Sequence, residues 1–131
     1  MAQGDSLNVN RNFSYLSVTF LTSGDYMSEL ATFTFHSDPG HAWLEVTMAQ
    51  LVDVGLEPSK FSPYSYYQRW GGQDIFYLEE DQDAYVFVGA YLNKHGKTPA
   101  IQESHTDTDH RIRRMASIAE SGWGDNQQER P

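Results

Sequence analysis

The fold of this chain is constrained most by a junction at residues 77–84, where a strand pattern changes into a helix pattern. In an extended chain the side chains of residues 75–78 point alternately to the two faces, and all four are apolar. This pattern predicts a strand over residues 75–80 whose two faces are both apolar. Four carboxylates within five positions lie where this strand ends.

After the junction, the apolar residues follow the i, i+3, i+4, i+7, i+8 spacing of a helix with one buried face. They are Ala84, Phe87, Val88, Tyr91 and Leu92. Asp81 is placed as the N-cap, and Asp83 falls in the first turn, where the helix dipole favours negative charge. Basic residues occupy the last turn, and Gly96 supplies a left-handed stop. The sequence therefore predicts a helix over residues 82–95.

Two hairpins are predicted from alternating residues and turn signals. The first joins residues 31–36 to residues 41–46 through Asp-Pro-Gly-His at 38–41, which fits a type II turn with Pro second and Gly third. The second joins a tyrosine-rich strand at residues 64–67 to the 75–80 strand through a turn with two consecutive glycines.

The remaining segments give weaker signals. Residues 13–22 alternate like a strand, and Thr47 with Gln50 matches a capping box that begins a short helix. Residues 97–110 are mostly polar and predict no element. Residues 110–118 are expected to form either an edge strand or a short helix that docks on the body.

The elements together predict an α+β domain: an antiparallel sheet of four or five strands with two helices packed on one face. The expected order is β–β–β–α–β–β–α followed by a tail. We expect a single domain over residues 13–118, a disordered N-terminus at residues 1–12 and a flexible C-terminal tail at residues 119–131.

Composition excludes several classes of protein. There is no Cys, so disulfides, thiolate nucleophiles and thiolate metal sites are ruled out. No apolar run is long enough to span a membrane, and the N-terminus lacks the layout of a signal peptide, so a soluble, cytoplasmic protein is expected.

The net charge of −9 is unevenly distributed along the chain. Residues 1–93 contain 12 acids and 3 bases, whereas residues 94–131 contain 6 of each. A negative field repels nucleic acid and anionic membranes and attracts basic protein surfaces. The charge therefore predicts a basic protein partner, with no direct binding to nucleic acid or membrane.

The acids around the junction are the most distinctive chemical feature. Together with Asp74, they are predicted to form a face that binds a basic partner: Glu79, Glu80, Asp81 and Asp83. They could instead be solvated acids that match a helix dipole, or ligands of a hard cation such as Mg²⁺. The spacing is not that of an EF-hand loop.

The histidines form two spaced pairs, His36 with His41 and His105 with His110. Either pair could bind Zn²⁺ with a neighbouring carboxylate, but structural zinc sites usually have four ligands and often use Cys. We therefore predict that the protein has no metal and no cofactor, and treat these histidines as weak metal candidates only.

Aromatic side chains give a second candidate interface. Tyr64, Tyr66, Tyr67 and Trp70 are predicted to leave rings exposed on one face of the second hairpin, beside the acids. The only basic cluster, residues 111–114, could contact phosphates, but the overall field opposes this.

Catalytic motifs are missing. The chain contains no Gly-x-Ser-x-Gly elbow, no Walker or dinucleotide-binding loop and no His-Glu-x-x-His pattern. A protein that is not an enzyme is therefore expected, with a metal-assisted hydrolase that uses the His and Asp positions as the alternative.

Four sequence blocks carry a resemblance: His-Ser-Asp-Pro-Gly-His at 36–41 with Trp-Leu-Glu-Val at 43–46, Tyr-Ser-Tyr at 64–66, and Tyr-Leu-Glu-Glu-Asp with Asp-Ala within 77–84. They resemble a family of small proteins of phages, plasmids and proteobacterial genomes. The resemblance covers residues 33–90 and extends toward residues 112–114. It transfers no catalytic residues and implies a mobile-element setting.

The resulting hypothesis is a small acidic protein-binding module of the phage-inhibitor type. It would act against CRISPR or restriction systems by presenting a negative surface, in the manner of a DNA mimic, to a basic nucleic-acid-binding partner. A homo-oligomeric accessory protein, such as a homodimer joined through the tyrosine hairpin, is a further alternative.

Overall fold

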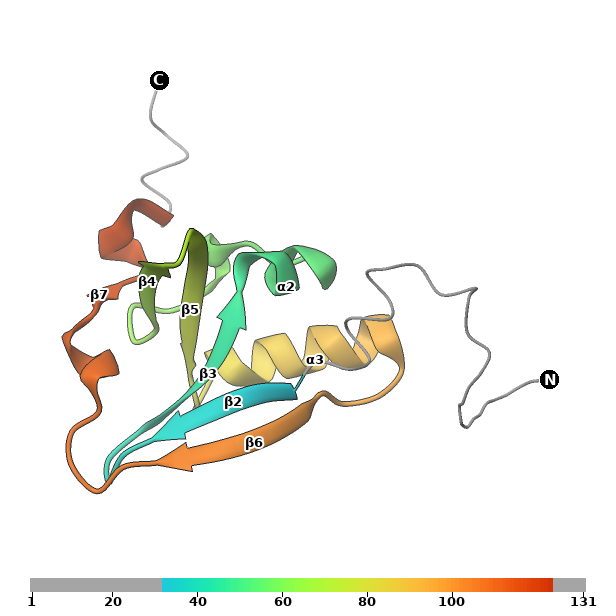
Figure 1. Cartoon of the computed structure of the whole chain (residues 1–131). Helices are drawn as coiled ribbons and strands as arrows, with labels where there is room; N and C mark the ends of the chain where they lie inside the picture. The colour runs from blue at the N-terminus through green and yellow to red at the C-terminus, as the bar shows by residue number, and fades with distance from the viewer. Residues whose placement is uncertain (1–31, 124–131) are drawn as a thin grey trace. The chain divides into compact units, whose positions relative to one another are not determined.

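The computed structural model describes residues 32–123, which form a mixed six-stranded sheet with helices (Figure 1). The strands lie in the order β6-β2-β3-β5-β4-β7. Their bounds are β2 (Thr32–Ser37), β3 (Ala42–Thr47), β4 (Tyr66–Trp70), β5 (Gln73–Glu79), β6 (Ala100–His105) and β7 (Ala116–Ser117). The predictions for residues 1–12 and 13–22, and for the tail beyond residue 123, lie outside the described residues.

Helical segments connect the strands. They are α2 (Met48–Asp53), α3 (Asp83–His95) and three short turns, η1 (Pro58–Lys60), η2 (Arg111–Arg114) and η3 (Ala119–Trp123). The α+β class is confirmed. The prediction for residues 110–118 is confirmed in both of its forms, because this segment contains η2 followed by the two-residue strand β7, which pairs with β4.

The predicted sheet is wrong in strand number and direction, and β6 is the reason. This strand runs parallel to β2, whereas the other neighbouring strands pair antiparallel. Every residue of β6 is exposed, so the strand is held by backbone pairing and not by burial of a side-chain face. Its polar sequence therefore gives no alternating pattern from which a strand could be predicted.

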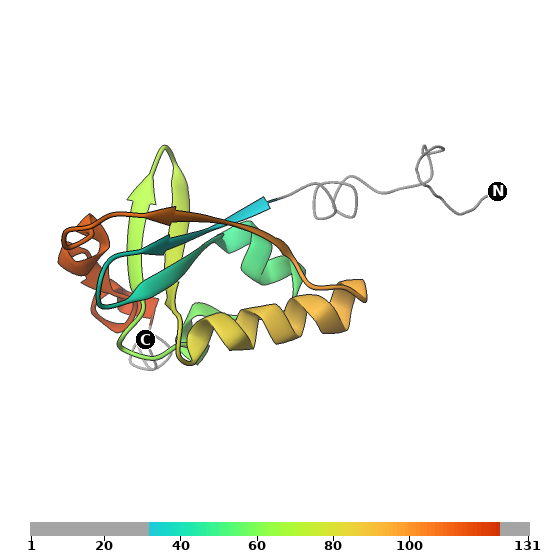
Figure 2. The ribbon, with the colours of Figure 1, turned by 90° about the horizontal axis from the view of Figure 1, so that it is seen from below.

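Different elements pack on the two faces of the sheet. On the first face, Phe33 of β2 packs on Phe87 and Tyr91 of α3, with ring centroids 5.2 and 5.7 Å apart. Helices α2 and α3 lie on the same side of the sheet, as Figure 2 shows. Asp53 at the end of α2 joins them, because its carboxylate bonds His95 of α3 at 2.8 Å.

The second face is covered by η2. Ile112 of η2 packs in a buried cluster with Trp43 of β3 and with Ile75 and Tyr77 of β5. Because the strand β5 has helices on one face and η2 on the other, residues 75–78 are all buried. This confirms the prediction of a strand that is apolar on both faces.

The ends of α3 confirm the predicted helix but not its predicted cap. Gly96 ends the helix in the left-handed conformation, with φ at 76°. The residue before the helix is Gln82, which makes no side-chain cap bond, so the prediction of Asp81 as N-cap is wrong. Asp83 in the first turn is buried and serves another purpose, described below.

Both hairpins are confirmed, but the first turn differs from its predicted type. A type II turn needs a positive φ at its third residue, and Gly40 does not have one. The turn is held instead by the Asp38 carboxylate, whose Oδ1 accepts the backbone N–H groups of Gly40 and His41. In the second hairpin, Gly71 and Gly72 have φ of 60° and 78°, as a two-residue hairpin turn requires.

Candidate functional site

A pocket of about 340 Å³ opens at the end of the sheet where β5 ends and β3 begins. Its lining comes from four parts of the chain: the β2–β3 turn with β3, the start of β4 with the segment before it, the end of β5 with the β5–α3 junction, and η2. The lining residues are His41, Trp43, Tyr64, Tyr66, Glu79, Asp81, Gln82 and Arg113.

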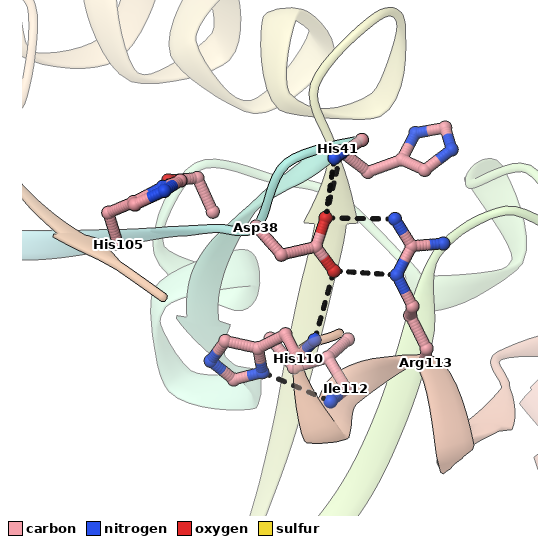
Figure 3. A network of polar contacts seen from close by, with 8 residues as sticks. Asp38, His41, His105, His110, Ile112 and Arg113 are labelled. Carbon is pink, nitrogen blue, oxygen red and sulfur yellow. Dashed lines mark hydrogen bonds and ion pairs between the residues drawn. The ribbon is translucent and has the colours of Figure 1, made fainter. Parts of the chain in front are cut away.

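One side of the pocket is built on an ion pair between the buried Asp38 and the partly exposed Arg113 (Figure 3). Arg113 donates from Nε to Oδ2 at 2.6 Å and from Nη2 to Oδ1 at 2.8 Å. Oδ1 also accepts the N–H groups of Gly40 and His41, at 2.9 and 3.0 Å, and Oδ2 accepts the N–H of His110 at 2.9 Å. The Arg113 guanidinium, with the three backbone donors, holds the pKa of Asp38 well below its usual range despite burial.

This ion pair joins segments that are 75 residues apart in sequence. It fixes η2 against the β2–β3 turn and places the Arg113 guanidinium over the Trp43 ring, 5.6 Å from the centroid. A bidentate arginine has little freedom to rotate, so its remaining nitrogen keeps a fixed direction. Arg113 is therefore a positioned cation and not a flexible surface charge.

The acids of the pocket lie on the β5–α3 junction. Glu79 is 7% exposed, and burial raises the pKa of its carboxyl group. Its Oε2 accepts the backbone N–H of Asp81 at 3.0 Å, which fixes the turn after the strand. The Asp81 side chain is exposed, so the pocket contains one buried acid and one solvated acid.

Asp83 organises the segment that carries Tyr64. Its Oδ2 accepts bonds from the backbone N–H and hydroxyl of Ser62, both at 2.8 Å, and from the hydroxyl of Ser65. The Ser65 hydroxyl in turn accepts the backbone N–H of Glu79 at 2.9 Å. A carboxylate in the first helical turn therefore holds the loop before β4 against the end of β5.

The predicted acidic face is not formed. Glu79 and Asp83 are buried, which leaves Glu80 and Asp81 as the acids with solvent access at the junction. Asp74 lies five residues before Glu79 on the same strand, about 17 Å away at the usual rise. Its carboxylate accepts bonds from Tyr67 and Arg69, both at 2.6 Å, and these donors lower its pKa. The structure therefore places Asp74 apart from the junction acids and buries two of those four.

The predicted aromatic interface is also divided. Tyr66 and Tyr67 are consecutive in β4 and so point to opposite faces. Tyr66 packs edge-on against Trp43 at 6.3 Å and lines the pocket, whereas Tyr67 lies near Phe76 on the other face. Tyr64 lines the pocket and is 70% exposed.

The remaining ring of the predicted interface lies elsewhere. Trp70 is at the tip of the second hairpin, where it is exposed and takes no part in the pocket. Two of the four predicted aromatic residues, Tyr64 and Tyr66, therefore belong to the candidate site.

The histidines are not paired as their spacing predicted. His36 bonds Glu45 at 2.7 Å, and its ring lies 5.2 Å from that of His110. His105 bonds the Ser37 hydroxyl at 2.8 Å, and His41 lies against Trp43. Among residues 32–123, no three His, Cys, Asp or Glu side chains are grouped so that they could hold a metal ion.

Sequence reasoning did not identify Asp38 or Arg113 as a pair, nor Trp43 and His41 as neighbours of the junction acids. Their contacts depend on how the C-terminal segment returns to the sheet, and no local pattern encodes that return. The blocks that carry the resemblance described above do meet here, since each contributes residues to the pocket.

Comparisons with known proteins add nothing to this picture: no family model, no curated protein and no solved structure matches the chain. Within the part of the chain that the structure describes, no helix is long and apolar enough to cross a membrane.

Proposed function

We propose that this chain is a protein-binding module without catalytic activity, whose pocket accepts a basic side chain of its partner. The observation that supports the proposal is the lining of the pocket, which combines the accessible rings of Tyr64 and Tyr66 with the carboxylates of Glu79 and Asp81. Aromatic rings attract cations through their faces, and carboxylates accept their N–H groups.

The size of the pocket suits one long side chain. At about 340 Å³ it lies at the lower end of the range for ligand sites, roughly 300–1,000 Å³. The apolar stem of a lysine or arginine would lie along the rings, and its charged end would reach the acids at the junction. Glu79, buried and with a raised pKa, would gain from a cation that stabilises its charged form.

In this proposal the partner is recognised at the pocket and not across a wide acidic surface. Several acids that contribute to the net charge are already bonded to cations or histidines within the fold, among them Asp38, Asp53, Asp74 and Glu45. The net charge of −9 would still speed the encounter with a basic partner and make it depend on salt. This favours a pocket for a side chain over an extended mimic of nucleic acid.

The inhibitor role against CRISPR or restriction systems rests on the resemblance and stays a prediction. The homo-oligomeric alternative also stays a prediction, which light scattering on the purified protein tests.

The proposal is tested by titrating the ¹⁵N-labelled full chain with a short arginine peptide and with the same peptide carrying citrulline, which has the same length but no charge. We expect amide shifts around residues 41–43, 64–66, 79–82 and 113 with arginine only. Equal binding of the two peptides would show that charge is not recognised.

Two matched variants sharpen this test. Asp81→Asn removes a solvated charge in the pocket, whereas Glu57→Gln removes an exposed charge outside it. Asp81→Asn is expected to weaken arginine binding about threefold to tenfold, and Glu57→Gln to change it less than twofold. Equal losses would mean that only the overall field matters.

A further inference from the structure

The pocket contains charges of both signs. Glu79 and Asp81 come from the β5–α3 junction, whereas Arg113 comes from η2, with the His41 ring from the β2–β3 turn beside it. A basic side chain alone would satisfy the acids and leave a guanidinium facing the same space. The lining is therefore complementary to a group that carries a cation and an anion together.

Arg113 has a nitrogen directed away from its ion pair. Nε and Nη2 bond Asp38, and the third nitrogen points away from the carboxylate (Figure 3). The Arg113 side chain is 31% exposed, so a ligand can reach it, whereas that of Asp38 is fully buried.

Asp38 and the more distant Asp109 offset part of the positive field of Arg113. The Asp38 carboxylate also accepts three backbone N–H groups, from Gly40, His41 and His110, which share in balancing its charge. Oriented backbone donors act as fixed partial positive charges. An anion beside Arg113 therefore meets a guanidinium backed by these donors.

We propose, on the basis of the function proposed above, that the occupant is the C-terminal residue of a partner chain, with a basic side chain and a free α-carboxylate. The carboxylate binds the outer edge of Arg113, with the His41 ring as a second donor. The side chain lies along Tyr64 and Tyr66, and its cation meets Glu79 and Asp81. Capture of a chain terminus by its carboxylate is an established mode of peptide recognition.

The inference predicts a difference between two peptides that share the same side chain. Acetyl-Gly-Gly-Arg with a free carboxylate should bind the full chain about tenfold more tightly than the same peptide with a C-terminal amide, because a charge-assisted bond to Arg113 is lost. Calorimetry or amide shifts give both dissociation constants.

The outcomes separate the two proposals. If acid and amide bind equally while citrulline in place of arginine abolishes binding, the C-terminal assignment is overturned and the basic-side-chain function stands. If the citrulline acid binds as tightly as the arginine acid, the proposed function is overturned. If none of the peptides binds, both proposals are overturned.

Variants locate the carboxylate. Arg113→Lys keeps the charge but loses the fork that grips Asp38 and presents the outer nitrogen, so the acid-to-amide ratio should fall from about ten to about two. Arg114→Lys, an exposed change in the same turn, should leave the ratio near ten. If Arg113→Lys does not fold, His41→Gln on the exposed ring should still lower the ratio. An unchanged ratio in the folded Arg113 or His41 variant would refute this placement.

Discussion

The ion pair between Asp38 and Arg113 makes a quantitative prediction about stability. In Asp38→Asn, Oδ1 can still accept the backbone N–H groups of Gly40 and His41, but the amide NH₂ replaces Oδ2 and faces two donors, the Arg113 Nε and the His110 N–H. The variant therefore loses a charge-assisted pair and leaves buried donors without acceptors.

The expected loss follows from these contacts. Breaking a deeply buried pair costs about 3–5 kcal/mol, and a smaller value applies here because Arg113 is partly exposed. We expect the free energy of unfolding to fall by about 2 kcal/mol, and the melting temperature by about 8 °C for a domain of this size. Urea unfolding followed by tryptophan fluorescence measures the loss.

The pH dependence gives an independent check. Because the pKa of Asp38 is lower in the folded protein than its ordinary value of 3.8, its contribution is fully present above pH 4 and is lost as pH falls below it. The difference in free energy of unfolding between the native protein and Asp38→Asn should therefore become smaller in acid. Asp107→Asn, whose side chain is 96% exposed, is the control and should cost less than about 0.5 kcal/mol. A loss below about 1 kcal/mol for Asp38→Asn, or a gap independent of pH, would refute the assigned role.

Two substitutions and one titration test other parts of the structure. Ser65→Ala removes the hydroxyl that donates to Asp83 and accepts from the Glu79 N–H. The free energy of unfolding in urea should fall by about 2 kcal/mol. A loss near zero would contradict both bonds. Burial and the neighbouring His36 imidazole on β2 lower the pKa of His110, so NMR should show His110 titrating below 6.5. As the pH falls through that pKa, the bond from the Ile112 N–H to His110 Nδ1 and the stability it contributes are lost. Titration at or above 6.5 would contradict this environment. Gly96→Ala places a Cβ at φ 76° and should cost about 1 kcal/mol by thermal melting, and an unchanged melting temperature would contradict the left-handed cap.

The sequence predicts those parts of the fold that short-range patterns encode. The helix that ends at Gly96, the capping box of Thr47 and Gln50, and both hairpins depend on residues a few positions apart. Each combines an apolar period with a capping or turn residue of matching chemistry, so pattern and chemistry agree.

The parts that could not be predicted depend on long-range pairing. Strand β6 pairs with β2 through its backbone and buries no side-chain face, so its sequence carries no period. The acids at the junction show the same limit, since spacing alone cannot tell that Asp83 turns inward to two serines while Asp81 stays in solvent. Only the folded arrangement assigns them different roles.

The central claim, that the pocket holds a basic side chain among aromatic rings, is tested most directly by nuclear Overhauser contacts in a complex with acetyl-Gly-Gly-Arg. We expect contacts from the arginine methylene protons to the Tyr64 and Tyr66 rings. Contacts to Trp70 at the hairpin tip instead, or saturable binding with no contact to either pocket ring, would contradict it.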